Sequence, residues 1–261
     1  MLNVIPSLFV FFFGAIVGSF LNCVIYRLET GGNFLKGRSF CPHCKHILSW
    51  QDLIPIFSFI GLGGRCRYCQ QKISWQYPFV EISTAIIFLL IFKQFLILNF
   101  INLIYYWLIA SFLIIIFVYD LKHYLVPDKI IYPAIGIALI FNFQFLILKQ
   151  FQIFNYSILS ALGAAAFFLT IVLISRGRWM GIGDIKLAFL MGLILNWPAV
   201  LVALVSSFYI GAIFGLGLMA FGKKELKSEV PFAPFLVTGT FLALFWGSEL
   251  INWYQTTFLL K

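Results

Sequence analysis

Residues 178–192 read RWMGIGDIKLAFLMG, and they place an acid, Asp184, where a long apolar run begins. A second stretch, IIIFVYDLKHYLVPDKI at 114–130, ends another apolar run at Asp120. A carboxylate at the boundary of a bilayer is costly unless it is solvated, paired or used in chemistry. Two such acids require a joint explanation, and it depends on the kind of chain that carries them.

The composition is that of an integral membrane protein. Of its 261 residues 62% are hydrophobic and only 10% are charged, whereas a soluble domain carries roughly a quarter charged residues. Residues 1–26 lack the basic start and the small-residue cleavage site of a signal peptide, so we expect this segment to stay in the membrane. The net charge of +9 would suggest a nucleic-acid partner in a soluble protein. In this membrane protein the distribution of the basic residues is explained by membrane topology, and we expect no nucleic-acid partner.

Eight apolar runs predict an all-α polytopic membrane protein, because a helix needs about 20 residues to cross about 30 Å of hydrocarbon. The runs are 4–25, 79–98, 102–119, 130–148, 156–175, 185–197, 199–221 and 232–252. The sixth is short and stops at Asn196-Trp197-Pro198, so we expect the sixth and seventh runs to form a helical hairpin with a tight turn. No internal repeat is evident.

The Lys and Arg residues are distributed unequally between the two sides of the membrane. Fifteen fall in the loops after the first, third, fifth and seventh runs: Arg27, Lys36, Arg38, Lys45, Arg65, Arg67, Lys72, Lys122, Lys129, Arg176, Arg178, Lys186, Lys223, Lys224 and Lys227. The other side holds only Lys93, Lys149 and Lys261. The positive-inside rule makes the basic loops cytoplasmic and both termini external. Asp120 and Asp184 are therefore predicted on the same, cytoplasmic, face.

The first loop is much longer than the others and is polar, basic and rich in glycine. We predict that residues 27–78 form a small cytoplasmic domain between a first membrane helix, 1–26, and a membrane domain, 79–261. A domain of this size with few large apolar side chains needs a further means of stabilisation.

Two C-x-x-C motifs supply it. The spacing pairs Cys41 with Cys44 and, after twenty-one residues, Cys66 with Cys69. Four thiolates in two such pairs complete a closed tetrahedral zinc site, and a cytoplasmic position argues against disulfides. Four unrelated thiols and a redox C-x-x-C pair are the alternatives to structural zinc. Because four sulfurs fill the site, we expect His43 and His46 to face solvent and Cys23 to be a packing residue.

The two acids have a functional interpretation if the helices bring them together. Two neighbouring carboxyls cannot both ionise, so one keeps a proton while the other acts as a base, which suits activation of water against a peptide carbonyl. Gly181 and Gly183 let the backbone turn and a neighbouring segment approach closely. Asp184 is then predicted in the first turn of the sixth helix, where the helix dipole favours a carboxylate.

Simpler interpretations exist for each acid. Asp120 could pair with Lys122, and Asp184 with Lys186, as ordinary ion pairs. Asp128, after Pro127, is predicted to cap the fourth helix. The G-x-G-D sequence and the shared membrane face favour the joint interpretation.

Four motifs together resemble the type IV prepilin peptidases, membrane aspartic proteases of the G-x-G-D class that are also N-methyltransferases. They are GSFLNCVIYRL at 18–28, the four-cysteine segment 41–81, YDLKHYLVPD at 119–128 and GIGDIKLAFLMG at 181–192. The resemblance covers most of the chain. It implies that Asp120 and Asp184 are catalytic and that the four cysteines hold zinc.

The resemblance also implies a substrate and a second reaction. Such enzymes cleave the basic leader of prepilins and pseudopilins at the cytoplasmic face of the bacterial inner membrane. Many then methylate the new N-terminus with S-adenosylmethionine, for which no glycine-rich binding loop is legible here. Glu81 is either an acid used in methylation or a first-turn helix acid. Glu29, Asp52 and Glu81 are the acids that we expect to attract a basic leader.

Two other functions share some of these features. Intramembrane proteases of the presenilin or signal-peptide-peptidase type also carry YD and GxGD, but the four-cysteine loop argues against them. A proton-coupled transporter could use Asp120 and Asp184 as relay sites, although such sites usually lie near the bilayer midplane.

Overall fold

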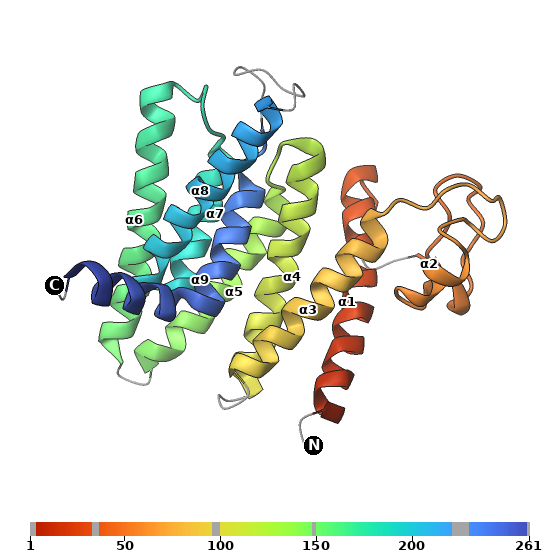
Figure 1. The fold of residues 1–261 in the computed structure, drawn as a ribbon, viewed down its shortest axis with the longest axis horizontal. Coiled ribbons are helices and arrows are strands. Elements are labelled where there is room, and N and C mark those ends of the chain that lie inside the picture. Colours follow the sequence, from red (N-terminus) through yellow and green to blue (C-terminus); the bar gives the residue numbers. More distant parts are fainter. Residues whose placement is uncertain (1–3, 33–36, 96–99, 148–149, 221–229, 260–261) are drawn as a thin grey trace. The chain divides into compact units, whose positions relative to one another are not determined.

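The computed structural model describes residues 4–32, 37–95, 100–147, 150–220 and 230–259, and this part of the chain contains helices and no strand. The eight long helices are α1 (Val4–Thr30), α3 (Gln76–Phe95), α4 (Phe100–His123), α5 (Asp128–Ile147), α6 (Phe151–Ser175), α7 (Ile182–Leu195), α8 (Ala199–Ala220) and α9 (Ala233–Tyr254) (Figure 1). Three short helical segments, η1 (Trp50–Leu53), α2 (Phe57–Gly61) and η2 (Gln255–Leu259), complete the described elements. Each long helix falls on one of the eight predicted runs, which confirms the predicted all-α fold.

Six of these helices are long and apolar enough to cross a membrane, and the chain is a multi-pass membrane protein. They are α1, α3, α4, α6, α8 and α9 with its extension. Helix α5 is not among the six, and α7 has only 14 residues. The tight turn predicted after the sixth run is confirmed, because α7 ends at Leu195 and α8 begins at Ala199.

The chain forms two compact units, residues 1–115 and 116–261, and α4 contributes to both. In the first unit α1 packs closely on α3. A Cβ atom on Gly14 would lie 2.8 Å from the Ala85 Cα, and one on Gly18 would lie 2.7 Å from the Glu81 Cα. These glycines, four residues apart on one face of α1, allow the two backbones to approach as small residues do in membrane helix pairs.

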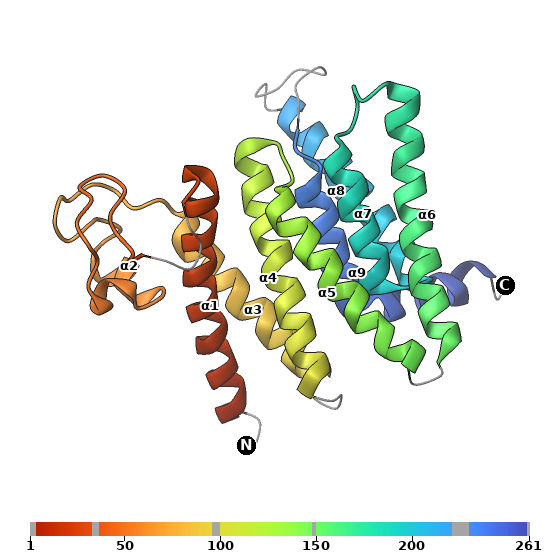
Figure 2. The same ribbon diagram turned by 180° about the vertical axis from the view of Figure 1, so that it is seen from behind.

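In the second unit α7 is the central helix. It packs against α5, α6, α8 and α9 (Figures 1 and 2), and nine of its residues are buried. A Cβ atom on Gly192 would clash with the backbone of Ala161 in α6. From α5, the Asn142 side chain donates a hydrogen bond to the Leu193 carbonyl at 3.1 Å. Helix α7 therefore has a fixed position, and Asp184 lies at its start.

Candidate active site and metal centre

Asp120 lies in the last turn of α4, which continues four residues beyond the end of the predicted run at 119 and stops at His123. The Asp120 residue is only 4% exposed. Its carboxylate accepts a hydrogen bond from the backbone N–H of Ala233. The Oδ2 atom is buried and has no hydrogen-bond partner among the described residues. A buried carboxylate oxygen without a protein partner is unusual, and it is what a group that must bind a substrate or a water molecule requires.

Ala233 is the first residue of α9, so the N-terminus of α9 supplies the N–H that Asp120 accepts. The positive end of a helix dipole also favours a carboxylate there. The sequence does not predict this contribution. Pro234 marks the start of a helix, but nothing local connects it with an acid more than a hundred residues upstream.

Asp184 is the third residue of α7 and is 8% exposed. Its Oδ2 atom accepts a hydrogen bond of 3.3 Å from the backbone N–H of Gly181, the residue that precedes the helix. The prediction that Asp184 lies in the first turn of this helix is confirmed. The helix start therefore fixes the direction of the carboxylate and favours its charge.

The two glycines of the G-x-G-D motif have different roles. A Cβ atom on Gly183 would lie 2.8 Å from the Val126 Cβ and 2.9 Å from its Cγ2. Val126 belongs to the loop that follows Asp120, so the close approach predicted from the sequence is confirmed at Gly183. Gly181 has an ordinary φ of −81°, and a Cβ atom there would have no neighbour nearer than 3.9 Å. The prediction that Gly181 allows a special backbone turn or a close approach is therefore wrong.

The carboxyl groups of Asp120 and Asp184 are close enough for the charge of one to act on the other. The alternative that Lys186 neutralises Asp184 is wrong, because Lys186 forms its ion pair with Asp128 at 2.6 Å. Asp128 begins α5 and its side chain is exposed. The structure therefore brings together the two acids that the sequence singled out and places the basic residue elsewhere.

The four cysteines of the C-x-x-C motifs also come together. Their Sγ atoms all lie within 4.8 Å of one another, and Cys41 Sγ lies 3.9 Å from Cys69 Sγ. Tetrahedral zinc with Zn–S bonds of about 2.3 Å separates its sulfurs by about 3.8 Å, so these residues fit such an ion. The backbone N–H of Gln71 lowers the pKa of the Cys69 thiol, but burial and the other three thiols outweigh it and raise the pKa to about 11. A cation would replace those protons. As predicted, His43 and His46 are exposed.

The two cysteine pairs lie in equivalent turns. One isolated β-bridge joins Phe40 to Ile47, and another joins Arg65 to Lys72, so both partners of the second bridge lie twenty-five residues after those of the first. In each turn the residue after the second cysteine, Lys45 or Gln70, has a φ of 59°. The sequences CPHCKHILSWQ and CRYCQQKISWQ match in the same register. The statement that the chain has no internal repeat is therefore wrong, and the signal was the Ser-Trp-Gln that follows each pair.

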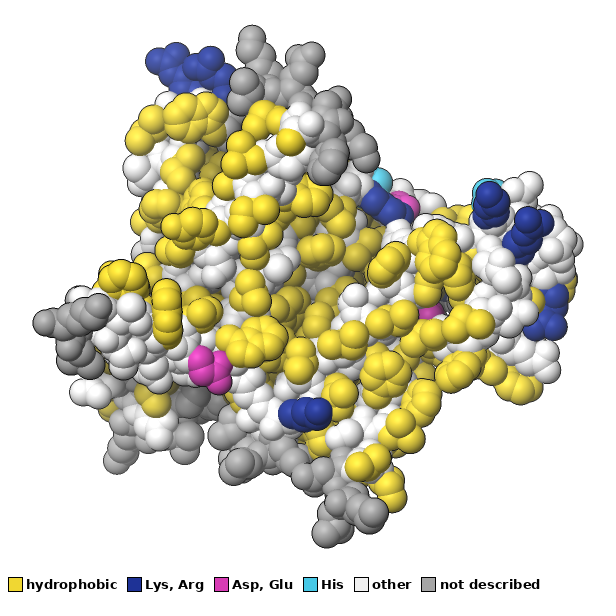
Figure 3. All heavy atoms as spheres, in the orientation of Figure 1, with side chains coloured by type: hydrophobic (Ala, Val, Ile, Leu, Met, Phe, Trp, Pro, Cys, Tyr) yellow, Lys and Arg dark blue, Asp and Glu magenta, His cyan; other side chains and the backbone are white. Residues whose placement is uncertain are grey.

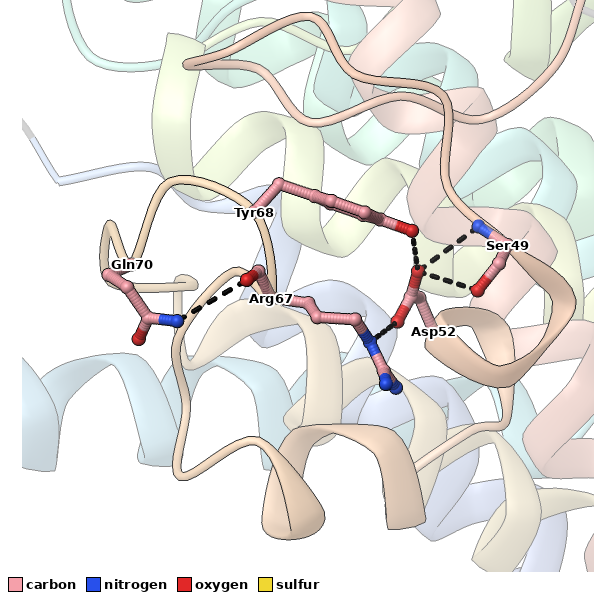
Figure 4. A network of polar contacts seen from close by, with 5 residues as sticks. All are labelled: Ser49, Asp52, Arg67, Tyr68 and Gln70. Atoms are coloured by element: carbon pink, nitrogen blue, oxygen red, sulfur yellow. Dashed lines mark hydrogen bonds and ion pairs between the residues drawn. The ribbon is translucent and has the colours of Figure 1, made fainter.

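A polar network links the two turns (Figure 4). Asp52 accepts hydrogen bonds from the side chains of Arg67 at 2.8 Å, Tyr68 at 3.2 Å and Ser49 at 2.8 Å. Burial raises the pKa of Asp52, but the hydrogen bonds from Ser49, Arg67 and Tyr68 outweigh it and hold the pKa below its usual value. The Asp52 side chain is 4% exposed. The expectation that it attracts a basic leader is therefore wrong.

Glu81 is buried between α1 and the segment before α2. Its Oε2 atom accepts a hydrogen bond of 2.7 Å from the backbone N–H of Ile56, and the Ser19 side chain also donates to it. Because α3 begins at Gln76, Glu81 lies in the second turn, and the interpretation as a first-turn helix acid is wrong. Being buried, it is also not an acid that attracts a leader. Ile56 has a φ of 65°, which is strained for a β-branched residue, so Glu81 holds an unfavourable backbone in place.

Comparisons with known proteins agree with this arrangement. Residues 12–95 match the model of the bacterial peptidase A24 N-terminal domain, and residues 107–216 match the model of the type IV leader peptidase family. No solved structure matches the chain.

Three relatives carry the name prepilin leader peptidase/N-methyltransferase. The protein from Legionella pneumophila is 34% identical over 93% of this chain and 92% of its own length. The protein from Bacillus subtilis (strain 168) is 32% identical over 94% and 96%, and that from Aeromonas hydrophila is 30% identical over 96% and 94%. The chain therefore belongs to the type IV leader peptidase family and is a membrane peptidase with methyltransferase activity.

Proposed function

We propose that this protein cleaves the basic leader from type IV prepilins and pilin-like secretion subunits and then N-methylates the new N-terminus. The names of its relatives support the substrate class. The observation that carries the reaction is the pair of buried carboxyls, Asp120 and Asp184, of which Asp120 has a buried oxygen without a hydrogen-bond partner among the described residues.

In the proposed mechanism Asp120 and Asp184 share one proton. The ionised carboxylate takes a proton from a water molecule as the water oxygen attacks the scissile carbonyl carbon, and the protonated carboxyl donates to the carbonyl oxygen. The tetrahedral intermediate collapses when the leaving nitrogen receives a proton. No covalent bond to the enzyme forms. The N-termini of α7 and α9 support this role, because each aims backbone N–H groups at one of the acids.

We place the cleavage at the cytoplasmic boundary of a bacterial inner membrane. The unequal distribution of Lys and Arg supports this orientation, because a basic leader stays in the cytoplasm while the apolar start of a pilin lies in the membrane. In this proposal residues 79–261 carry the peptidase, and residues 27–78, between the first helix 1–26 and the rest, serve methyl transfer.

The proposal includes two groups that must bind to the chain, a zinc ion and S-adenosylmethionine. Cys41, Cys44, Cys66 and Cys69 would hold one zinc ion, which would fix the fold of the cysteine domain. S-adenosylmethionine would supply the methyl group. Glu81 is the acid of this unit that we propose for methylation, because it is buried and close to the cysteine domain through Ile56.

The test uses a prepilin peptide with a basic leader ending in Gly-Phe, S-adenosylmethionine and the purified full-length protein, with products read by mass spectrometry. Loss of a general acid or base costs roughly 10²–10⁴ in rate, so Asp120→Asn and Asp184→Asn should each lose cleavage to that extent. The matched control is Asp128→Asn, which removes an exposed ion pair with Lys186 and should keep cleavage. Full cleavage by Asp184→Asn would remove that residue from the mechanism.

The alternatives make different predictions in the same assays. An intramembrane protease of the presenilin type would cut a peptide within its apolar segment instead of at the leader junction. A proton-coupled transporter would show uptake driven by a pH gradient in proteoliposomes. The match over both family domains favours the leader peptidase over either of them.

A further inference from the structure

The cysteine domain contains an apolar segment, so the prediction that residues 27–78 are polar throughout is wrong. The twelve residues between Asp52 and Arg65 carry no charge. They include α2, and their apolar side chains point outward: Phe57 is 59% exposed and Ile60 is 69% exposed. Leu53 and Ile54 are exposed as well. In water such a patch would be a liability, so its environment requires an explanation.

The segment lies beside the membrane helix α1 and not beyond its end. Both views show α2 level with the middle of α1 (Figures 1 and 2). The Phe57 ring stacks with the Phe12 ring of α1 at a centroid distance of 6.3 Å. Phe12 lies eighteen residues before Thr30, the C-terminal end of α1, which is about 27 Å along the helix axis. Phe57 therefore reaches a depth at which α1 itself is surrounded by hydrocarbon.

Several backbone N–H groups of the segment are satisfied within the protein, as hydrocarbon requires, because no water is present there to satisfy a free N–H group. The N–H groups of Ser58, Ile60 and Leu62 each donate to the carbonyl four or fewer residues back. Pro55 has no N–H group to satisfy. The N–H of Ile56 donates to the Glu81 carboxylate of α3. Glu81 thus satisfies a donor that water would satisfy in a soluble loop.

The internal repeat supports the same environment. Trp75 directly precedes α3, a membrane helix, and its equivalent in the repeat, Trp50, is the first residue of η1, which precedes α2. Both indoles are exposed, as is typical of Trp at a membrane interface. Figure 3 shows hydrophobic side chains along the lower edge of the cysteine domain and Lys and Arg side chains on its upper and outer parts. The cysteine domain is therefore amphipathic, with one apolar side.

We propose that residues 53–62 insert into the bilayer beside α1 and contact lipid acyl chains as a re-entrant segment. The cysteine domain then rests in the membrane surface instead of standing free in the cytoplasm. Leader cleavage by the aspartates does not require this insertion, so it is independent of the proposed function.

The experiment is photolabelling of the full-length protein in phosphatidylcholine and phosphatidylglycerol vesicles that contain a phospholipid with a diazirine in the middle of its acyl chain. After irradiation and digestion, mass spectrometry locates the lipid adducts. Phe9 and Ile16 of α1 are exposed and serve as the positive reference, and the exposed Tyr68 of the second cysteine turn serves as the negative one. The expected result is an adduct yield at Phe57 and Ile60 about tenfold above that at Tyr68.

Two variants sharpen the test. Ile60→Asp should lose the adducts at residues 57–62 and keep those at Phe9, because a charge there opposes insertion. Gln70→Asp, at an exposed position on the second cysteine turn, should leave the labelling of residues 57–62 unchanged. Adducts on α1 with none on residues 53–62 would overturn the proposal. Unchanged labelling of residues 57–62 in Ile60→Asp would do so too.

Discussion

A Cβ atom on Gly183 would lie 2.8 Å from the Cβ of Val126, so the helix start that carries Asp184 and the loop that follows Asp120 touch where no side chain fits. Val126 lies six residues after Asp120, and Gly183 directly precedes Asp184. This contact fixes the distance between the two acid-bearing motifs.

Gly183→Ala should therefore reduce leader cleavage strongly. The added methyl group must displace the loop, and overpacking of this kind costs about 1–3 kcal/mol. A displacement of about 1 Å at reacting groups can cost roughly 100-fold in rate. Cleavage kinetics of the purified variant measure the effect.

Gly181→Ala is the matched control, because a Cβ atom there meets nothing nearer than 3.9 Å. It should keep nearly the activity of the wild type. Equal losses in the two variants would show that the contact with Val126 is not what makes Gly183 necessary.

Removal of one thiol should empty the metal centre. Cys41→Ser leaves three of the four clustered sulfurs, so we expect the zinc content, measured by plasma mass spectrometry, to fall from about one per chain to near zero. Cys23→Ser removes a thiol outside the cluster and should keep the metal. If the wild type contains no metal and all four thiols react freely with an alkylating reagent, the zinc proposal is wrong.

Glu81 can be tested for its two roles separately. Glu81→Ala leaves the buried N–H of Ile56 without its acceptor, which should lower the free energy of unfolding by about 1–3 kcal/mol. Glu81→Gln keeps an acceptor oxygen and should be close to the wild type in thermal unfolding, yet lose methylation while leader cleavage continues. Full methylation by Glu81→Gln would leave Glu81 with its structural role alone.

Asp52 should make the stability of the cysteine domain depend on acid pH. Its pKa is lowered in the folded protein because the hydrogen bonds from Ser49, Arg67 and Tyr68 outweigh burial. A lowered pKa stabilises the fold above the unfolded value and stops doing so as the pH falls through the folded value, here below about 4. The melting temperature of Asp52→Asn should thus lie below that of the wild type at pH 7, and the difference should shrink as the pH falls below about 4. A difference that stayed constant over this range would contradict the assignment.

Much of the fold follows from hydropathy. The eight runs predicted eight helices because a membrane helix satisfies its own backbone, so local composition decides where it lies. Ends were less predictable: α3 begins at Gln76 and α4 continues to His123, because polar residues at a helix end carry no apolar signal. That error placed Glu81 in the first turn instead of the second.

The site residues could be predicted where a local sequence motif marks them, and could not be predicted where the contact is made by a distant backbone group. G-x-G-D and C-x-x-C carry their chemistry in their spacing, so the four clustered cysteines and the neighbouring aspartates were found. The N–H of Ala233 is a backbone group that any residue except proline could supply, and Ile56 reaches Glu81 by a strained turn. Neither contact requires a particular residue type, so neither can be recognised in the sequence. The repeat of Ser-Trp-Gln was legible and was overlooked.

The length of α7 has a mechanical consequence. Its 14 residues rise about 21 Å, roughly 9 Å less than the hydrocarbon thickness of an ordinary bilayer. Asp184 at its start and Asn196 at its end therefore cannot both reach the lipid headgroups. Since α5, α6, α8 and α9 pack around α7, the missing length is filled by protein and not by lipid, and water or substrate must enter the helix bundle to meet the recessed end.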